Sequence, residues 1–300
     1  MSGIAASAHP DERPWLGAAL RVLAGLLFAA MSICGKSLSG STPLGEIVFF
    51  RSLFALIPLA AFLWLRSELP SGLATRKPLG HLLRSVLGAA AMFASFAAIA
   101  RLPLAEATLL GYLAPIFTAL AGVFILSERM TAGRAGGVII GFCGVVVLFW
   151  PELSGGQMSG DRLLGYGLGL LTGVLTAFAL IMVRRLNRTE SAGAIAFYFI
   201  LTSMIGGLAT LSFGWVTPDL TGLVLLVMAG IFGGLAHIAS TVAFRNAEAS
   251  FLAPFDYFAI IWPLLADLLL FNQPVSSAFI VALPLVLAGG AITVMGRKKF

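Results

Sequence analysis

The chain lacks the polar surface that a soluble protein of 300 residues needs. Only 11% of its residues are Asp, Glu, Lys or Arg, whereas 59% are hydrophobic. Soluble domains carry roughly 25% charged residues because their surfaces face water. A chain with less than half that share must present most of its surface to another medium. The composition therefore predicts a membrane protein.

Cysteine and histidine are also scarce. Cys34 and Cys143 both lie in apolar runs, where we expect small buried side chains and no disulfide framework. Three His and scattered acids provide no metal site, no predicted cofactor and no catalytic cluster of the kind that an integral-membrane enzyme requires. A repeated ring of filter residues, as expected for a channel, is absent from the sequence as well.

Acidic residues are outnumbered, which gives a formal net charge of +6. The Lys and Arg residues sit in short connectors rather than in one patch, so the charge does not predict a nucleic-acid partner. A basic excess near helix ends is instead typical of the cytoplasmic side of a membrane protein. We expect membrane lipids and a small-molecule substrate to be the partners of the chain.

Apolar stretches of about 20 residues recur along the whole chain, each long enough to cross a hydrocarbon core of ~30 Å. The first of them, from Trp15 to about Ile33, is too long for the core of a signal peptide and lacks a small-residue cleavage site. The connectors between the stretches are too short to hold a soluble domain. The ten predicted helices are residues 15–36, 44–65, 80–100, 104–126, 132–150, 162–184, 192–213, 221–244, 250–271 and 276–296.

The connectors alternate in charge, which predicts an orientation in the membrane. If the N-terminus is cytoplasmic, only Lys36, Arg101 and Arg162 fall on the outer side. This bias predicts an even number of helices with both termini cytoplasmic. The inner connectors and ends hold Arg13, Arg66, Arg76, Lys77, Arg84, Arg129, Arg134, Arg184, Arg185, Arg188, Arg245, Arg297, Lys298 and Lys299.

Two short motifs recur in the same order in the two halves of the chain. Ala-Glu-Ala-Thr at 105–108 corresponds to Ala-Glu-Ala-Ser at 247–250, and Gly-Tyr-Leu-Ala at 111–114 to Asp-Tyr-Phe-Ala at 256–259. Because five helices are an odd number, the second half must enter the membrane from the opposite side, as in many secondary transporters. We therefore divide the chain into a cytoplasmic tail (1–14), a first five-helix repeat (15–150), a periplasmic connector (151–161), a second repeat (162–296) and a basic cytoplasmic tail (297–300).

Ten helices in two halves, with Ser-Glu-Arg-Met-Thr at 127–131 running into a glycine-rich helix, resemble the drug/metabolite transporter superfamily. Within it the chain is similar to EamA-type members and most similar to YddG-like amino-acid exporters, from about Leu16 to Arg297. The sequence departs from the family pattern at Gln273, where an acid is usual. The resemblance implies a central cavity lined by the first four helices of each half, the fifth of each half forming a packing or dimer contact. It also implies location in the bacterial inner membrane, as a monomer or weak homodimer.

Charges within the predicted helices are the strongest candidates for function, since each costs at least ~2.5–3.5 kcal/mol at the membrane centre. Arg51 lies about 10 Å below the outer end of its helix and is too far around the helix to pair with Glu46. It is predicted to clamp a substrate carboxylate or act as a gate charge, or else to serve as a structural tether or reach toward the outer headgroups. Asp256 and Asp267 share one face of a helix and could bind an ammonium group, couple protons, or be solvated near helix ends.

Histidines and aromatic residues form a second group of candidates. His237 could accept a coupled proton or remain neutral between helices, and His81 could act in transport or be solvated at the interface. Tyr112 and Tyr257 occupy matching places in the two halves and could face one cavity, with Trp262 nearby. Ordinary core packing is the alternative for all three aromatic residues.

Proline and glycine mark bends and close contacts. Pro115 and Pro263 are predicted to kink their helices and could form gates. Gly133, Gly137 and Gly141 are spaced for close helix packing. Together these features predict a secondary transporter, not an enzyme, that exports aromatic and small neutral amino acids by alternating access. Export of other small metabolites or drugs is the alternative.

Overall fold

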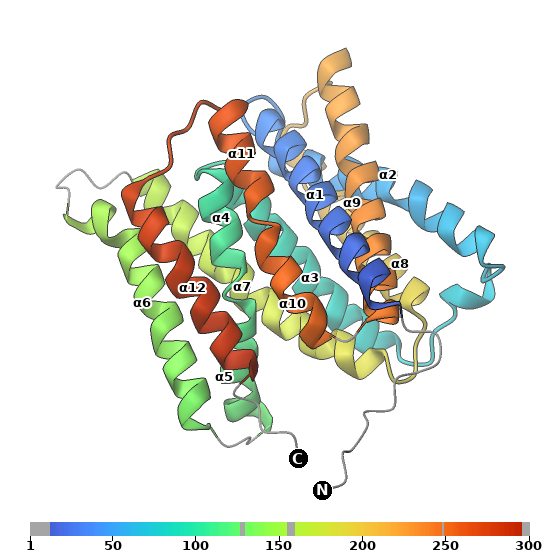
Figure 1. Cartoon of the computed structure of the whole chain (residues 1–300). Coiled ribbons are helices and arrows are strands. Elements are labelled where there is room, and N and C mark those ends of the chain that lie inside the picture. Colours follow the sequence, from blue (N-terminus) through green and yellow to red (C-terminus); the bar gives the residue numbers. More distant parts are fainter. Residues whose placement is uncertain (1–12, 127–129, 155–159, 248, 296–300) are drawn as a thin grey trace, which may run out of the picture.

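The computed structural model describes residues 13–126, 130–154, 160–247 and 249–295. Within these ranges all regular secondary structure is helical and no strand is present (Figure 1). The first half holds α1 (Pro14–Leu38), α2 (Leu44–Leu65), α3 (Pro78–Ile99), α4 (Leu104–Gly111), α5 (Ala114–Leu126) and α6 (Ala132–Ser154). The second holds α7 (Gly160–Leu186), α8 (Ala192–Leu208), α9 (Leu220–Asn246), α10 (Ala249–Phe258), α11 (Ile261–Leu269) and α12 (Ser277–Met295), and short 3₁₀ turns lie at Ser71–Leu73 and Leu211–Phe213.

The predicted membrane spans correspond to these helices, and α2 has the predicted bounds. With α4 and α5 taken as one span, nine described helices are long and apolar enough to cross a membrane. The ninth predicted span, 250–271, is divided into α10 and α11, of 10 and 9 residues, each too short to cross alone. The predicted spans 104–126 and 250–271 are each interrupted once, the first between α4 and α5 and the second between α10 and α11.

Both interruptions lie just before a proline. Pro115 is the second residue of α5 and Pro263 is the third residue of α11. A proline ring has no N–H and clashes with the carbonyl group four residues earlier, which here belongs to Gly111 or Ala259. The helix consequently ends before each proline and restarts around it. The expected kinks are thus short interruptions of the helical hydrogen bonding at similar places in the two halves, and turn hydrogen bonds connect the segments across each of them.

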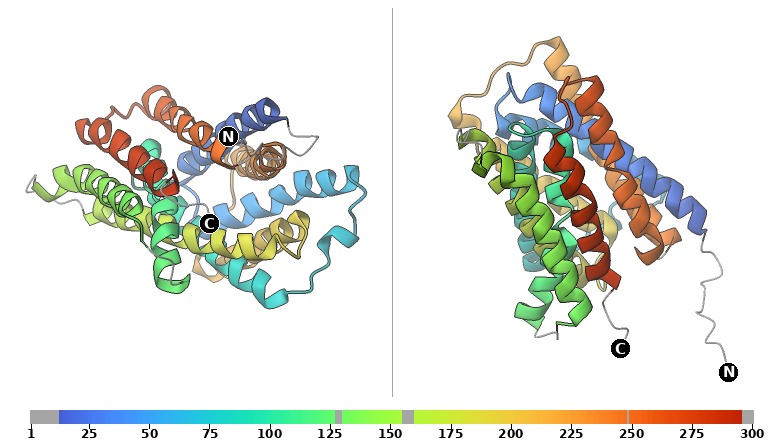
Figure 2. Two further views of the ribbon diagram at one scale, coloured as in Figure 1. Left: turned by 60° about the horizontal axis from the view of Figure 1, so that its bottom comes forward. Right: turned by 60° about the vertical axis from the view of Figure 1, so that its left-hand side comes forward.

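The helices of the two halves pack reciprocally (Figures 1 and 2). The first helix of each half lies along the third helix of the other, since α1 packs on α9 and α3 on α7. The second helices, α2 and α8, pack on each other, and so do the last helices, α6 and α12. In Figure 2 the α6–α12 pair stands at one side of the bundle.

Glycines allow α6 and α12 to approach closely. A Cβ atom built on Gly289 would lie 2.6 Å from the Cα atom of Gly141 and 2.7 Å from the carbonyl oxygen of Gly137. Gly137 faces Thr293 in the same contact, whereas Gly133 is exposed near the start of α6. Small residues at such spacing are the usual means of close helix packing in membranes.

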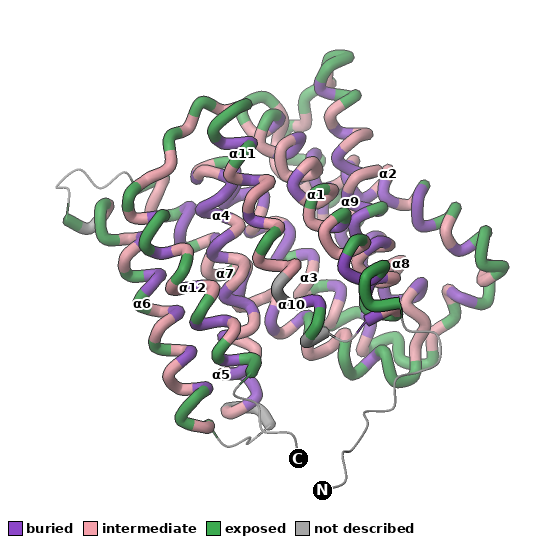
Figure 3. Tube along the Cα trace, in the orientation of Figure 1, coloured by how far each residue is buried: buried purple, intermediate pink, exposed green. Residues whose placement is uncertain are grey.

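The outward faces of the bundle are apolar. Large hydrophobic side chains are exposed along nearly every helix, and Figure 3 shows exposed and half-buried residues alternating with buried ones around each of them. Trp64, Leu65, Phe213 and Leu269 are each more than 70% exposed. An apolar surface of this extent is unfavourable in water and suits contact with lipid. The chain is a multi-pass membrane protein.

Candidate functional site

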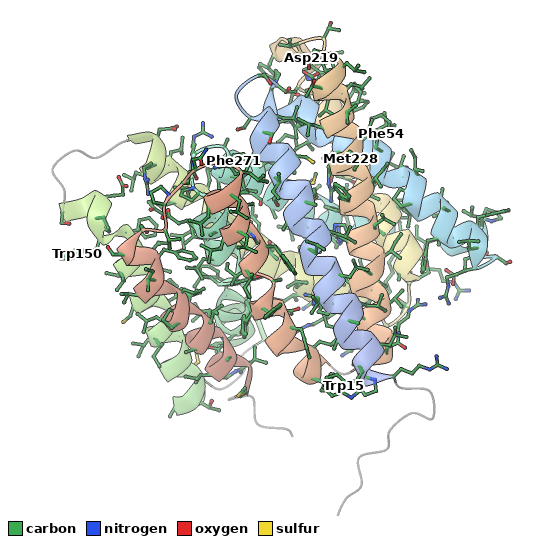
Figure 4. All side chains as sticks on the ribbon, turned by 45° about the horizontal axis from the view of Figure 1, so that its top comes forward. Trp15, Phe54, Trp150, Asp219, Met228 and Phe271 are labelled. Carbon is green, nitrogen blue, oxygen red and sulfur yellow. The ribbon has the colours of Figure 1, made fainter. Side chains whose placement is uncertain are left out.

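Two ends of the bundle are distinguished by labelled residues in Figure 4, Trp15 at the start of α1 and Asp219 before the start of α9. We refer to them as the Trp15 end and the Asp219 end. Helix α12 finishes at the Trp15 end (Figure 1).

Arg51 is buried inside the bundle, about 10 Å along α2 from the Asp219 end. Its side chain is only 2% exposed and is held by two thioethers. Nε lies 3.4 Å from Sδ of Met31 on α1, and Nη1 lies 3.1 Å from Sδ of Met92 on α3. Gly233 of α9 makes room for the guanidinium, because a Cβ atom there would lie 2.9 Å from Nη2. Thioether sulfur is a weak acceptor, so the charge has no strong partner in these contacts.

A second arginine, Arg84 of α3, carries another such charge. It lies about 9 Å along α3 from the Trp15 end. Its guanidinium stacks over the ring of Phe199 of α8 at 4.3 Å, and its Nε and Nη1 atoms are buried without a hydrogen-bond partner. A cation–π contact of this kind is worth about 0.5–2 kcal/mol, which does not replace a carboxylate.

His237 of α9 lies close to the surroundings of both arginines. It is one helical turn from Gly233, which borders the Arg51 guanidinium, and its ring contacts Phe199, over which Arg84 stacks. The ring packs edge-on against Phe28 of α1 and Phe199 of α8, with centroid distances of 5.1 and 5.8 Å. Helices α1, α2, α3, α8 and α9 thereby place two cations, an imidazole and two aromatic rings around one region. We call Arg51, Arg84, His237, Phe28 and Phe199 the cationic cluster.

The described acids are all engaged elsewhere. None of them bonds to Arg51 or Arg84 in the part of the chain that the structure describes. Six acids contact basic side chains: Glu68 contacts Arg66, Glu106 and Glu152 contact Arg162, Asp161 contacts Arg101, Glu190 contacts His81, and Asp256 contacts Arg21. The other three accept hydrogen bonds from backbone N–H groups: Glu46 from Val216, Asp219 from Gly222, and Asp267 from Leu104 and Ala105.

Asp256 of α10 is paired with Arg21 of α1, whose guanidinium also donates to the hydroxyl of Ser240 on α9. Arg21 stacks in addition over Phe244 of α9 at 4.9 Å. This pair connects three helices and is neutral as a whole. The carboxylate that was predicted to bind an ammonium group therefore already has a cationic partner within the protein.

Tyr112 and Tyr257 meet at the two helix breaks. Their rings lie edge to face with centroids 6.1 Å apart, and the Tyr112 hydroxyl donates to the carbonyl oxygen of Asp256 at 2.9 Å. The hydroxyl of Tyr257 lies beside Gly290 of α12. The indole of Trp262 approaches Gly25 of α1, and its buried Nε1 has no hydrogen-bond partner.

His81 is 1% exposed, so the alternative of solvation at the interface was wrong. Its Nε2 lies 3.1 Å from a carboxylate oxygen of Glu190 in the α7–α8 connector, and its ring packs against Tyr198 at 4.8 Å. The hydrogen bond with His81, followed by one from Thr75, holds the pKa of Glu190 below its ordinary value of 4.5. This contact fastens the start of α3 to α8.

Asp267, the second acid on the predicted helix face, caps α4. Its two carboxylate oxygens accept hydrogen bonds from the backbone N–H groups of Leu104 and Ala105 at 2.9 and 2.8 Å. Nearby, Lys36 of α1 donates to the carbonyl oxygens of Ile99 and Leu102. These bonds fasten α1, α3, α4 and α11 together at the Asp219 end.

Sequence reasoning missed Arg21 and misplaced Arg84. Arg21 lies inside the first apolar run, and the rule that identified Arg51 would have identified it as well. Arg84 was assigned to an inner connector, yet it lies within α3 as a half-buried residue whose Nε and Nη1 atoms are buried and whose guanidinium stacks on Phe199. Among the described residues no group of three His, Cys, Asp or Glu could hold a metal ion.

A multi-pass helical protein with unpaired charges buried between its helices has the character of a membrane transporter. Comparison with known proteins identifies the family. The model of the EamA-like transporter family matches residues 15–150. The pseudopaline exporter of Pseudomonas aeruginosa is 30% identical over 82% of this chain and 84% of its own length. The chain belongs to the EamA-like transporter family and is a membrane transporter of small molecules.

Other relatives are named for different activities. The S-adenosylmethionine uptake transporter of Rickettsia bellii is 27% identical and matches 76% of each chain. An uncharacterized transporter of Helicobacter pylori is 29% identical over 92% of this chain and 93% of its own. A solved crystal structure shares the fold, with a TM-score of 0.65 and 21% identity over 96% of this chain and all of that one. Family membership thus identifies the chain as a transporter, whereas the relatives differ in substrate and in the direction of transport.

Proposed function

We propose that this transporter exports amino acids or closely related carboxylate-bearing metabolites from the cytoplasm by alternating access. The observation that carries the proposal is Arg51, buried in the bundle with two thioethers as its only described polar partners. A guanidinium matches the geometry of a carboxylate, and binding one would supply the strong partner that the protein does not provide. The aromatic rings of Phe28 and Phe199, beside His237, could receive an apolar side chain of the substrate.

The halves 15–150 and 162–296 would act as inverted repeats that rock about a site between them. The reciprocal packing of α1 on α9 and α3 on α7 supports this arrangement, as do the matching breaks before Pro115 and Pro263. These breaks are the proposed gates. The charge of the connectors supports an inner bacterial membrane with the Trp15 end, and hence both tails, in the cytoplasm.

The direction of transport is part of the proposal. Relatives include both an exporter of pseudopaline and an uptake transporter for S-adenosylmethionine. We favour export because the pseudopaline exporter, at 30% identity, is more similar to the chain than the uptake transporter at 27%. The resemblance in the helix motifs is also to exporters. Export of other small metabolites or drugs is the second candidate function.

Proteoliposomes containing the purified full-length protein test the proposal. Vesicles loaded with labelled Trp, Phe, Met, Thr, Asp and Glu should release at least one of them faster than protein-free vesicles do. Arg51→Gln should abolish that release, and Arg51→Lys should retain part of it by keeping the charge. Release of no compound above the protein-free rate, from vesicles with correctly inserted protein, would refute amino-acid export. Repeating the panel with an imposed pH gradient measures proton coupling, which Asp256→Asn or His237→Gln should alter if either residue carries the proton.

A further inference from the structure

The cationic cluster holds two positive charges, not one. Arg51 and Arg84 come from neighbouring helices, and the same segment of α9 lies beside both, since Gly233 borders Arg51 and His237 shares the ring of Phe199 with Arg84. The nearby Arg21–Asp256 pair adds no net charge. Every described acid has another partner, so no carboxylate of the described chain balances either guanidinium.

A zwitterionic amino acid would leave this imbalance in place. It brings one carboxylate and one ammonium group, so its net charge is zero, and its ammonium group would lie among cations. A ligand with two carboxylates supplies one anion for each guanidinium, and if it also has an ammonium group its net charge of −1 lowers the excess from two positive charges to one. Buried charges are favourable only when they are paired and hydrogen-bonded.

The two arginines also approach from different levels of the bundle. Arg51 lies about 10 Å from the Asp219 end of α2, and Arg84 about 9 Å from the Trp15 end of α3. Two carboxylates at separate positions on one molecule suit this arrangement better than a single group contacted by both. Phe199 lies between Arg84 and His237, so an apolar segment between the carboxylates would have an aromatic surface to contact.

We propose that the substrate is a dicarboxylic amino acid or a derivative of one, with its two carboxylates bound separately by Arg51 and Arg84. Arg84 is then a specificity-determining residue that the sequence did not indicate. This inference rests on the proposed function, since it names the substrate class of the same site. It goes beyond the proposed function because it requires a second anionic group on the substrate.

Isosteric pairs of ligands test the inference. Glutamate and glutamine, or aspartate and asparagine, differ only by a carboxylate in place of an amide. In proteoliposomes with full-length protein, unlabelled dicarboxylic compounds should compete for transport with half-maximal concentrations at least tenfold below those of their amides, which corresponds to about 1.4 kcal/mol. The series should include 2-aminoadipate, which separates the carboxylates further.

Arg84→Gln should reduce this discrimination to about threefold or less, while transport of the amide continues. Arg84→Lys should restore part of the discrimination, which a purely structural role for the side chain would not predict. Arg66→Gln is the matched control, because Arg66 is exposed and paired with Glu68 at the other end of α2, and it should leave the ratio unchanged.

The possible failures are distinguishable. Equal competition by acid and amide in the wild-type protein would overturn the inference and leave amino-acid transport intact. Preference for O-phosphoserine over glutamate without discrimination between glutamate and glutamine would assign the two charges to a phosphate group and also overturn it. Absence of transport for every compound would refute the proposed function itself. A ratio that is unchanged in Arg84→Gln, with normal transport of both members of a pair, would exclude Arg84.

Discussion

The cap that Asp267 forms on α4 allows a quantitative test of how the broken helices are held. Asp267 is 3% exposed and accepts hydrogen bonds from the first two backbone N–H groups of α4, at 2.9 and 2.8 Å. Helix α4 has only eight residues, so it cannot be stable without such contacts. The side chain that caps it comes from α11, the second segment of the other broken helix.

Replacing Asp267 with Ala leaves both N–H groups buried without an acceptor. Each unsatisfied donor costs about 1–3 kcal/mol, so the pair predicts a loss of about 2–6 kcal/mol in the free energy of unfolding. Asp267→Asn keeps one carbonyl acceptor but loses the negative charge at the helix N-terminus, and its loss should be about half as large. Lys36, which lies in electrostatic range of Asp267, would also lose a nearby anion in both variants.

Reversible unfolding in mixed micelles, with sodium dodecyl sulfate as denaturant and circular dichroism as the signal, would measure these losses. Asp161→Ala is a suitable control, because Asp161 pairs with Arg101 at a carboxylate that is 68% exposed. Such a surface pair is worth about 0–1 kcal/mol. If Asp267→Ala unfolded within about 0.5 kcal/mol of the wild type, or if it lost no more than the control, the cap would not stabilise α4 and the reasoning would be wrong.

Three further predictions concern the remaining contacts. Arg21→Gln and Asp256→Asn should each destabilise the protein, by at most about 3 kcal/mol because the two side chains are 20–30% exposed. In a double-mutant cycle the double variant should lose less than the sum of the two single losses. Additive losses would argue against the ion pair. Because the pKa of Glu190 is lowered, its stabilising effect is complete above pH 4.5 and is lost as the pH falls through the lowered value. Glu190→Gln should therefore unfold with a weaker dependence on pH below 4.5, and an identical pH profile would contradict this. Gly289→Val should lower the free energy of unfolding by about 1–3 kcal/mol, because the added side chain overpacks the α6–α12 contact. Gly133→Val, at an exposed position, should lower it clearly less. Equal losses in the two variants would exclude close helix packing as the cause.

Much of the fold follows from elementary patterns in the sequence. Each apolar run of about 20 residues became a helix or a pair of helix segments, because a hydrocarbon core demands that length and forces backbone groups to bond within it. The position of the breaks was harder to predict. Pro58 and Pro284 lie inside continuous helices, whereas Pro115 and Pro263 follow breaks, so the outcome depends on surrounding contacts as well as on the proline ring.

The site could be predicted only in part, for a different physical reason. Spacing along one helix excluded a Glu46–Arg51 pair, and Glu46 does bond elsewhere, to the amide of Val216. Partners on other helices depend on rotation and depth, which spacing does not determine. Arg21 and Asp256 are separated by 235 positions in the chain, and nothing local in either segment indicates the other. Arg84 was misplaced because a residue one or two turns into a helix can be either solvated or buried, and tertiary packing decides which.

The sulfur contacts of Arg51 have a consequence for oxidative damage. Oxidation converts a methionine thioether to a sulfoxide, whose oxygen is a polar acceptor. Met92 holds its sulfur 3.1 Å from Nη1 of Arg51, so a sulfoxide there would offer the guanidinium a resident acceptor. That acceptor would compete with cargo for the charge on which the proposed function rests. Oxidant exposure should therefore inhibit transport without unfolding the protein, and methionine sulfoxide reductase would be the enzyme able to reverse the inhibition.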